Sequence, residues 1–165
     1  MLQYHFKQHS ACGLPLVACS FLVNLQMQIF QQISHPVILF DGVCNLCNSS
    51  VQKVIKHDPE RKFRFASLQG QLGQQALAQF HLPATDFNSF LLLADGKLFT
   101  RSTAALKVMK EMNGGWKWLY YLLIIVPPFI RNFFYDFIAR NRYKWFGKQE
   151  ACWLPTPVLK ALFYD

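Results

Sequence analysis

The stretch VILFDGVCNLCNSS, Val37 to Ser50, decides the fold. Its first four residues are apolar and typical of a buried strand, which ends at Asp41. Apolar residues then recur at helical spacing and predict a helix over Asn45 to His57. Cys44 and Cys47 therefore lie where a strand ends and a helix begins, and we expect their side chains to point the same way.

The elements after this stretch complete an α/β layer architecture. We expect strands at Phe63–Ala66, Phe90–Leu93 and Leu98–Thr100, and helices at Gly70–Phe80, Ser102–Met112, Trp116–Val126 and Phe129–Tyr143. Asp95-Gly96 has the residue types of a hairpin turn, and Ser102 is expected to cap its helix. The order β-α-β-α-β-β-α resembles that of thioredoxin-like folds, here with additional C-terminal helices.

The chain of 165 residues is long enough to bury a core in one domain, which we expect over residues 36–165. Its longest apolar run, Trp118 to Ile130, is interrupted by Pro127-Pro128 and is shorter than the roughly 20 residues of a spanning helix. We therefore predict no transmembrane segment. This run is expected to be buried core rather than an interfacial segment, although the second interpretation stays open.

Residues 1–35 differ in composition from the rest of the chain, since they contain no acidic residue. Leu16 to Cys19 resembles a lipoprotein cleavage site, but the positive region before it is weak. We interpret this segment as an extension outside the fold, which favours a cytoplasmic protein. The alternative is an export signal, which would make the protein exported or lipid-anchored.

The net charge of +8 comes largely from the second half of the chain. A basic face suits an acidic partner, a nucleic-acid phosphate or an anionic membrane surface, and is equally typical of solvated helix ends. No RNA-binding signature or zinc-finger spacing accompanies it, so nucleic-acid binding is not predicted. Peripheral membrane contact remains open.

Cysteines at a helix start have a specific chemistry. The unpaired N–H groups and the positive dipole end stabilise a thiolate, which thiol–disulfide exchange requires. We expect Cys44 to be the exposed nucleophile and Cys47 to be shielded and to resolve the mixed disulfide. Asp41 is assigned proton transfer, because its negative charge would by itself raise a thiol pKa.

Two other interpretations of the pair are weaker. The five cysteines are Cys12, Cys19, Cys44, Cys47 and Cys152, an odd number that does not suit a disulfide-stapled domain. A structural zinc site needs four ligands, and no second pair at matching spacing exists. Simple packing of two small residues in the core is the remaining alternative. Cys152 is either a buried structural residue or a third redox thiol.

Four motifs carry a resemblance to the DCC family of thiol-disulfide oxidoreductases. They are FDGVCNLCN with Asp41, Cys44 and Cys47, HDPERKFRFASLQG (His57–Gly70), DGKLFTRSTAAL (Asp95–Leu106), and PPFIRNFFYDFIARNRYKWFG (Pro127–Gly147) followed by Cys152 and Pro155. The resemblance covers roughly residues 36–155. It implies a thioredoxin-like fold and protein-disulfide reductase activity through the Asp and the two Cys, without a metal or an organic cofactor.

The resemblance also implies the partners, a protein or small-molecule disulfide substrate and a thiol reductant. The recurring residues Arg101, Arg131, Tyr135, Arg140, Asn141, Arg142 and Tyr143 are expected to hold the C-terminal helices on the core. Thioredoxins place a proline before the third strand, but here Phe87–Ser89 precedes it. We therefore expect the C-terminal Arg/Tyr/Trp segment to form the wall opposite the cysteines. The alternative function is a non-catalytic binding or scaffold domain that uses this basic aromatic face, with the cysteines structural or weakly metal-binding.

Overall fold

The strand and the helix around the two cysteines form with the expected bounds. A computed structural model of the chain describes residues 33–83, 90–149, 157 and 159–164, and the elements lie within one unit, Ser34–Asp165. In chain order they are β1 (Val37–Phe40), α2 (Asn45–His57), β2 (Arg64–Ser67), α3 (Gln71–Gln79), β3 (Leu91–Ala94), β4 (Lys97–Thr100), α4 (Arg101–Glu111), α5 (Trp116–Ile124), α6 (Pro128–Phe146) and the 3₁₀ turn η1 (Lys160–Leu162).

The four strands form one mixed sheet in the order β2-β1-β3-β4. β1 runs parallel to β2, with Val37 opposite Arg64, and antiparallel to β3. β3 and β4 pair as the expected hairpin around Asp95-Gly96, where both residues have positive φ. This topology is a thioredoxin-like α/β fold, so the predicted fold class is confirmed.

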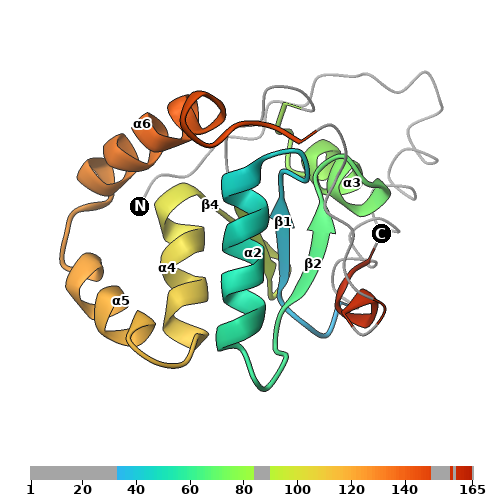
Figure 1. Cartoon of the computed structure of the whole chain (residues 1–165), viewed down its shortest axis with the longest axis horizontal. Coiled ribbons are helices and arrows are strands. Elements are labelled where there is room, and N and C mark those ends of the chain that lie inside the picture. Colours follow the sequence, from blue (N-terminus) through green and yellow to red (C-terminus); the bar gives the residue numbers. More distant parts are fainter. Residues whose placement is uncertain (1–32, 84–89, 150–156, 158, 165) are drawn as a thin grey trace, which may run out of the picture. The chain divides into compact units, whose positions relative to one another are not determined.

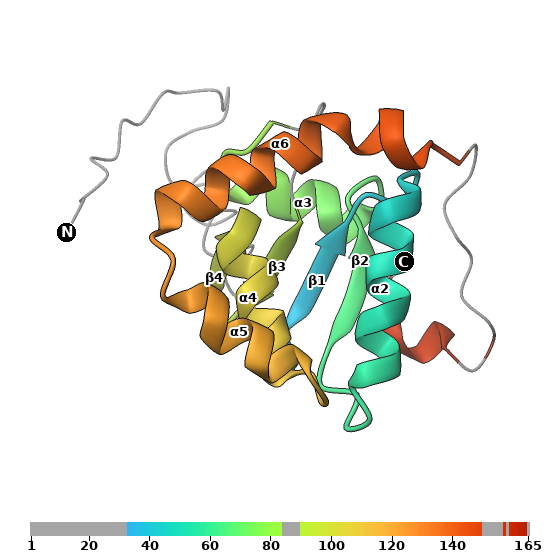
Figure 2. The ribbon, with the colours of Figure 1, turned by 60° about the vertical axis from the view of Figure 1, so that its left-hand side comes forward.

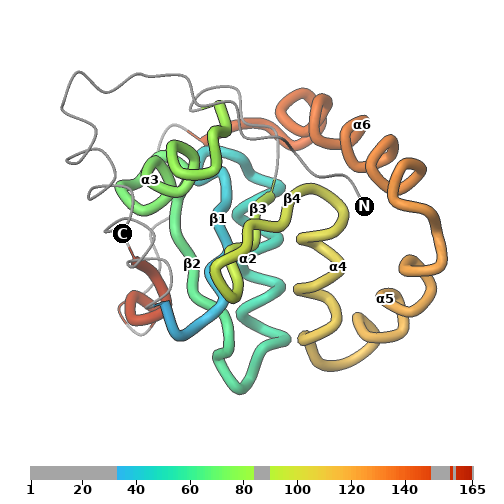
Figure 3. Tube along the Cα trace, turned by 180° about the vertical axis from the view of Figure 1, so that it is seen from behind, coloured from blue at the N-terminus to red at the C-terminus, as the bar shows by residue number. Residues whose placement is uncertain are grey.

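Helices cover both faces of the sheet, which explains why all of β1 is buried. α2 and α4 share one core cluster with Ile38 and Phe40 of β1, and α3 lies on the opposite face (Figures 1 and 3). α3 approaches the end of β2 so closely that a Cβ at Gly73 would lie 2.2 Å from the carbonyl oxygen of Ser67. The C-terminal residues also reach the core, because Leu162 joins the same cluster.

α5 and α6 pack against α4, and the C-terminal end of α6 reaches the start of α2 (Figures 1 and 2). Their position corrects the expectation that Trp118–Ile130 forms buried core, because α5 contains no buried residue. Trp118 and Ile125 are each 81% exposed. The sequence predicted burial from hydrophobicity alone, but α4 covers only one side of these helices.

The expected polar network holds α6 on the core through Arg101, Tyr135, Arg142 and Tyr143, but not through Arg140, which is exposed, or Asn141, whose side chain donates to Phe137 O within α6. The Tyr135 hydroxyl accepts a hydrogen bond from the Phe90 N–H at 2.8 Å, and Arg101 Nε lies 3.4 Å from Asp136 Oδ1. One detail of α4 differs from prediction: Thr100 is the N-cap, and Ser102 lies inside the helix, where its hydroxyl donates to Asn132 Oδ1 at 2.6 Å.

Some of the predictions fall outside the described residues. They concern nearly all of the extension 1–35 with Cys12 and Cys19, the Phe87–Ser89 segment, and Cys152.

Candidate active site

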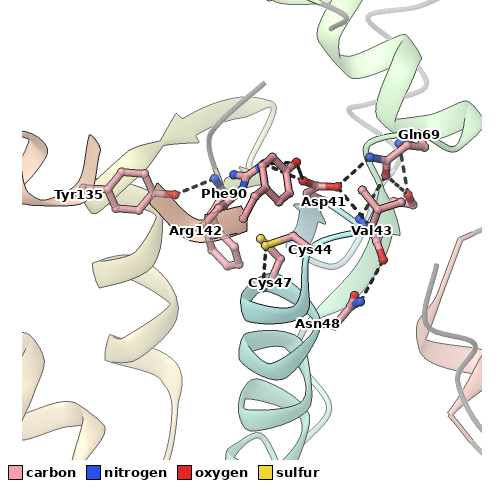
Figure 4. A network of polar contacts seen from close by, with 12 residues as sticks. Asp41, Val43, Cys44, Cys47, Asn48, Gln69, Phe90, Tyr135 and Arg142 are labelled. Carbon is pink, nitrogen blue, oxygen red and sulfur yellow. Dashed lines mark hydrogen bonds and ion pairs between the residues drawn. The ribbon is translucent and has the colours of Figure 1, made fainter. Parts of the chain in front are cut away.

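The two cysteines lie at the start of α2, as the spacing predicts (Figure 4). A tight turn follows β1, in which the Cys44 N–H donates to the Asp41 carbonyl at 3.2 Å. Cys44 is the N-cap, and its Sγ accepts the Cys47 N–H at 3.4 Å. A helix start offers N–H groups without partners inside the helix, and the Cys44 sulfur takes one of them.

These contacts distribute the protons unequally over the two thiols. The hydrogen bond from the Cys47 thiol, the Cys47 N–H and the charge of Arg142 lower the pKa of Cys44 from an ordinary 9.0 to about 6, against burial and the charge of Asp41. The hydrogen bond to Cys44 and burial raise the pKa of Cys47. Cys44 is therefore the thiolate near neutral pH, and Cys47 holds the shared proton.

Asp41 is buried and hydrogen-bonded through both carboxylate oxygens. Oδ1 accepts from the Gln69 side-chain amide at 2.8 Å and from the Val43 N–H at 3.2 Å. Oδ2 accepts from Arg142 Nη2 at 2.6 Å and from the Tyr143 hydroxyl. As expected, the charge of Asp41 raises the pKa of both thiols. The carboxylate thus offsets part of the acidifying effect of Arg142.

Arg142 and Asp41 form a buried ion pair, since each side chain is only 4% exposed. A buried pair is tolerated when its geometry is good and further hydrogen bonds satisfy it, which the Gln69 amide and the Tyr143 hydroxyl supply. The expected structural role of Arg142 is confirmed. Its position beside the thiols adds a second effect, because its charge lowers the pKa of Cys44.

Exposure of the two cysteines is the reverse of the prediction. Cys44 has no exposed surface, whereas Cys47 is partly exposed. The segment Gly147–Gln149, which follows α6 and which we call the cover segment, lies against the backbone of Val43 and Cys44. Its Gln149 N–H donates to the Val43 carbonyl at 2.8 Å, and Lys148 forms a β-bridge with Cys44.

The cover segment is held at both ends. Gly147 has φ +77°, a conformation that favours glycine, and it turns the chain back toward the cysteines. The Asn45 side-chain amide donates to the Phe146 carbonyl at 2.8 Å, and Lys148 Nζ lies 4.2 Å from the centre of the Tyr143 ring. The side-chain amide of Asn48 on α2 donates to the Gly42 carbonyl at 2.9 Å and fixes the turn between β1 and α2.

A pocket of about 370 Å³ opens beside the accessible thiol. α2, α4 and α6 supply most of its walls, and the residues that line it are Leu46, Cys47, Ser50, Lys53, Val54, Phe90, Ala105, Val108, Met109, Met112, Trp116, Tyr135, Ile138, Ala139 and Arg142. Most of them are apolar, with Cys47 and Arg142 among the polar exceptions. The expectation that the C-terminal segment faces the cysteines therefore holds for Arg142 and Tyr135.

Sequence reasoning missed Gln69 as a member of the site. Its side chain accepts from the Gly42 N–H at 3.1 Å while its amide holds Asp41. A signal was present, because the carboxyl ends of parallel strands meet at one edge of a sheet, and Gln69 follows β2 as Asp41 follows β1. Among the described residues, no group of three or more His, Cys, Asp or Glu could hold a metal ion.

Comparisons with known proteins agree with the motif-based resemblance. A family model described as DCC1-like thiol-disulfide oxidoreductase matches residues 38–148, which include every site residue described above except Gln149. Uncharacterized protein YuxK from Bacillus subtilis is 49% identical over 133 residues, or 81% of this chain and 96% of the relative. A chloroplastic DCC family protein from Arabidopsis thaliana is 38% identical over 123 residues, or 74% of this chain and 72% of the relative. No solved structure matches significantly.

Proposed function

Because the chain belongs to the DCC1-like thiol-disulfide oxidoreductase family, we propose that it is a protein-disulfide reductase acting through Cys44 and Cys47. The observation that carries the proposal is the unequal pair of thiols at a helix start. Cys44, with a pKa of about 6, is the attacking thiolate, and Cys47 supplies the hydrogen bond that stabilises it.

The exchange proceeds in two steps. The Cys44 thiolate attacks one sulfur of a substrate disulfide, which forms a mixed disulfide and releases the first substrate thiolate. Cys47 then loses its proton and attacks the Cys44 sulfur, which closes the Cys44–Cys47 disulfide and releases the second substrate thiolate. Both released thiolates end as thiols, and the two electrons come from the enzyme dithiol. A thiol reductant restores the dithiol.

The first step removes the negative charge of Cys44, and this loss makes Cys47 easier to deprotonate for the second step. The Cys47 pKa is raised chiefly because its thiol donates to the Cys44 thiolate. Once Cys44 is in a mixed disulfide, this charge is gone, while the positive charge of Arg142 remains to favour the Cys47 thiolate. We assign Asp41 the acceptance of the Cys47 proton, with Arg142 and Tyr143 as its positioning residues. Burial and the hydrogen bond to Asp41 raise the pKa of Tyr143, so its hydroxyl keeps its own proton.

The size of the pKa change favours a reductase over an oxidase. At pH 7, lowering the pKa from 9.0 to about 6 stabilises the reduced state by roughly 1 kcal/mol, which raises the potential of a two-electron couple by only about 20 to 30 mV. The potentials of thioredoxin and DsbA differ by about 150 mV, and their attacking cysteines have pKa values of about 7 and about 3.5. Cys44 lies nearer the reducing member of this pair.

Substrate reaches the site through the apolar pocket beside Cys47. The apolar walls of this pocket suit apolar side chains that flank a substrate disulfide. Displacement of the cover segment then exposes the Cys44 sulfur to the substrate. Arg142 also lines this pocket, and its charge acts on both thiols.

The test is the reduction potential of the pair, together with a trapping experiment. Purified protein is equilibrated with glutathione buffers, and the redox state of each cysteine is read by alkylation and peptide mass. We expect a reversible two-electron transition nearer the thioredoxin value of about −270 mV than the DsbA value of about −120 mV. With a peptide disulfide, Cys47→Ser is expected to accumulate a mixed disulfide at Cys44, and Cys44→Ser none.

A pair that never closes would refute the reductase proposal. The binding-domain alternative would then gain support, since it predicts that Cys44→Ser leaves function intact.

A further inference from the structure

The outward faces of α5 and α6 are apolar, in contrast to an ordinary surface helix. On α6, Tyr135, Asp136, Arg142 and Tyr143 make polar contacts with the rest of the domain. Apart from Ile138, which lines the pocket beside Cys47, the exposed apolar residues of the two helices and their junction are Trp118, Tyr121, Leu122, Ile124, Ile125, Phe129, Ile130, Phe133, Phe134, Phe137, Trp145 and Phe146. We call these side chains the outer apolar face.

Helical spacing makes the α6 part of this face continuous. Phe129, Phe133 and Phe137 follow one another at intervals of four residues and lie on one side of the helix. Phe129 is 74% exposed and Phe133 69% exposed. The rings of Phe137 and Trp145, two turns apart, are 5.5 Å between centres. An apolar patch of this extent is rare on a protein that has no partner there.

The charges on this face are positive. Arg140 and Lys144 are exposed on the same side of α6 as the phenylalanines, and Lys117 is exposed on α5. α5 has no acidic residue, and the acidic residue of α6, Asp136, forms an ion pair with Arg101. The face therefore combines aromatic and aliphatic side chains with cations and presents no exposed carboxylate.

We propose that the outer apolar face docks on the surface of an anionic lipid membrane. Aromatic side chains enter the boundary between headgroups and acyl chains, and Arg140, Lys144 and Lys117 contact the lipid phosphates. The contact is peripheral, because no helix among the described residues is both long and apolar enough to cross a membrane. A second copy of the chain fits this face less well, since a twofold contact would bring cations against cations.

The experiment measures co-sedimentation of the reduced full-length protein with vesicles. Vesicles of phosphatidylcholine alone are compared with vesicles that also contain phosphatidylglycerol, at low and high salt. Binding is expected on the anionic vesicles and is expected to weaken at high salt. Phe133→Ser/Phe137→Ser is expected to weaken binding to them more than tenfold, because the apolar insertion is lost.

A matched pair of charge variants isolates the cationic contribution. Arg140→Gln/Lys144→Gln is expected to weaken binding to anionic vesicles by about 25-fold, at about fivefold per basic residue. Lys56→Gln/Lys97→Gln removes the same charge from exposed positions on α2 and β4 and is expected to change it less than threefold. Thermal unfolding and the alkylation midpoint of Cys44 verify that each variant keeps the fold and the redox site.

Three results would overturn the proposal. The first is that the protein binds neither kind of vesicle, and the second is that the two charge variants lose binding equally. The third is that the wild type does not bind vesicles but forms a dimer in sedimentation velocity, and Phe133→Ser/Phe137→Ser dissociates that dimer. None of these readouts depends on reductase activity, so the docking proposal and the proposed function succeed or fail separately.

Discussion

Replacement of Cys47 by alanine tests the origin of the low Cys44 pKa. The largest cause that lowers this pKa is the hydrogen bond from the Cys47 thiol, followed by the Cys47 N–H and then the charge of Arg142. Cys47→Ala removes the first cause and keeps the other two. Cys47→Ser is the matched control, because its hydroxyl can still donate to the thiolate.

The expected change is large at neutral pH. With a pKa of about 6, Cys44 is about 90% thiolate at pH 7, whereas a thiol with the ordinary pKa of 9.0 is about 1% thiolate. We expect the Cys44 titration midpoint to rise by more than one pH unit in Cys47→Ala and by less in Cys47→Ser. The alkylation rate at pH 7 should fall by less than the thiolate fraction, because nucleophilicity grows as the pKa rises.

The assay is alkylation of Cys44 with isotopically labelled iodoacetamide between pH 4 and about 10. Peptide mass spectrometry separates Cys44 from the other cysteines. An unchanged midpoint in Cys47→Ala would refute the hydrogen-bond origin. A wild-type midpoint near 9 would refute the thiolate assignment itself.

Three further predictions concern the surroundings of the pair. Gln149→Pro removes the N–H that donates to the Val43 carbonyl, so we expect Cys44 to be alkylated several-fold faster than in Gln149→Ala, which keeps that N–H; equal rates would contradict a covering role for this segment. Arg142→Gln leaves the Asp41 charge buried and is expected to cost about 3 to 5 kcal/mol in urea unfolding, of which the additional Asp41→Asn change should restore a part; additive losses would contradict the ion pair. Because the folded-state pKa of Cys44 is lowered, the contribution of its thiolate to the free energy of unfolding is fully present above the unfolded pKa and is lost as pH falls through about 6. The free energy of unfolding of the reduced protein, measured with urea, should therefore rise by about 2 kcal/mol between pH 6 and about 8, and that of Cys44→Ser should not.

The sequence was sufficient for the elements whose signals are local. A short continuous apolar run predicted β1, and apolar residues at helical spacing predicted α2, both with their observed bounds. The pairing of Cys44 with Cys47 also followed from spacing along one helix. The other bounds differ by one to three residues, as helix and strand ends usually do.

Long-range contacts could not be predicted in the same way. The Gln149 N–H donates to the carbonyl of Val43, a residue far away in the sequence, and no periodicity indicates that the cover segment lies against Cys44. The exposure of the two cysteines was therefore predicted in the wrong order. The run Trp118–Ile130, in α5 and the start of α6, shows a related limit, since hydrophobicity predicts which residues avoid water but not whether protein or something else covers them.

The contact between Asp41 and Arg142 joins residues 101 positions apart, which has a consequence for biosynthesis. At about 5 to 20 residues per second, a ribosome adds Arg142 about 5 to 20 seconds after Asp41. During this interval the newly made cysteines have neither the guanidinium that acidifies them nor the segment that covers Cys44. The contacts between Cys44 and Cys47 are local to α2, but the contribution of Arg142 and the cover over Cys44 arrive late, when the last helix docks.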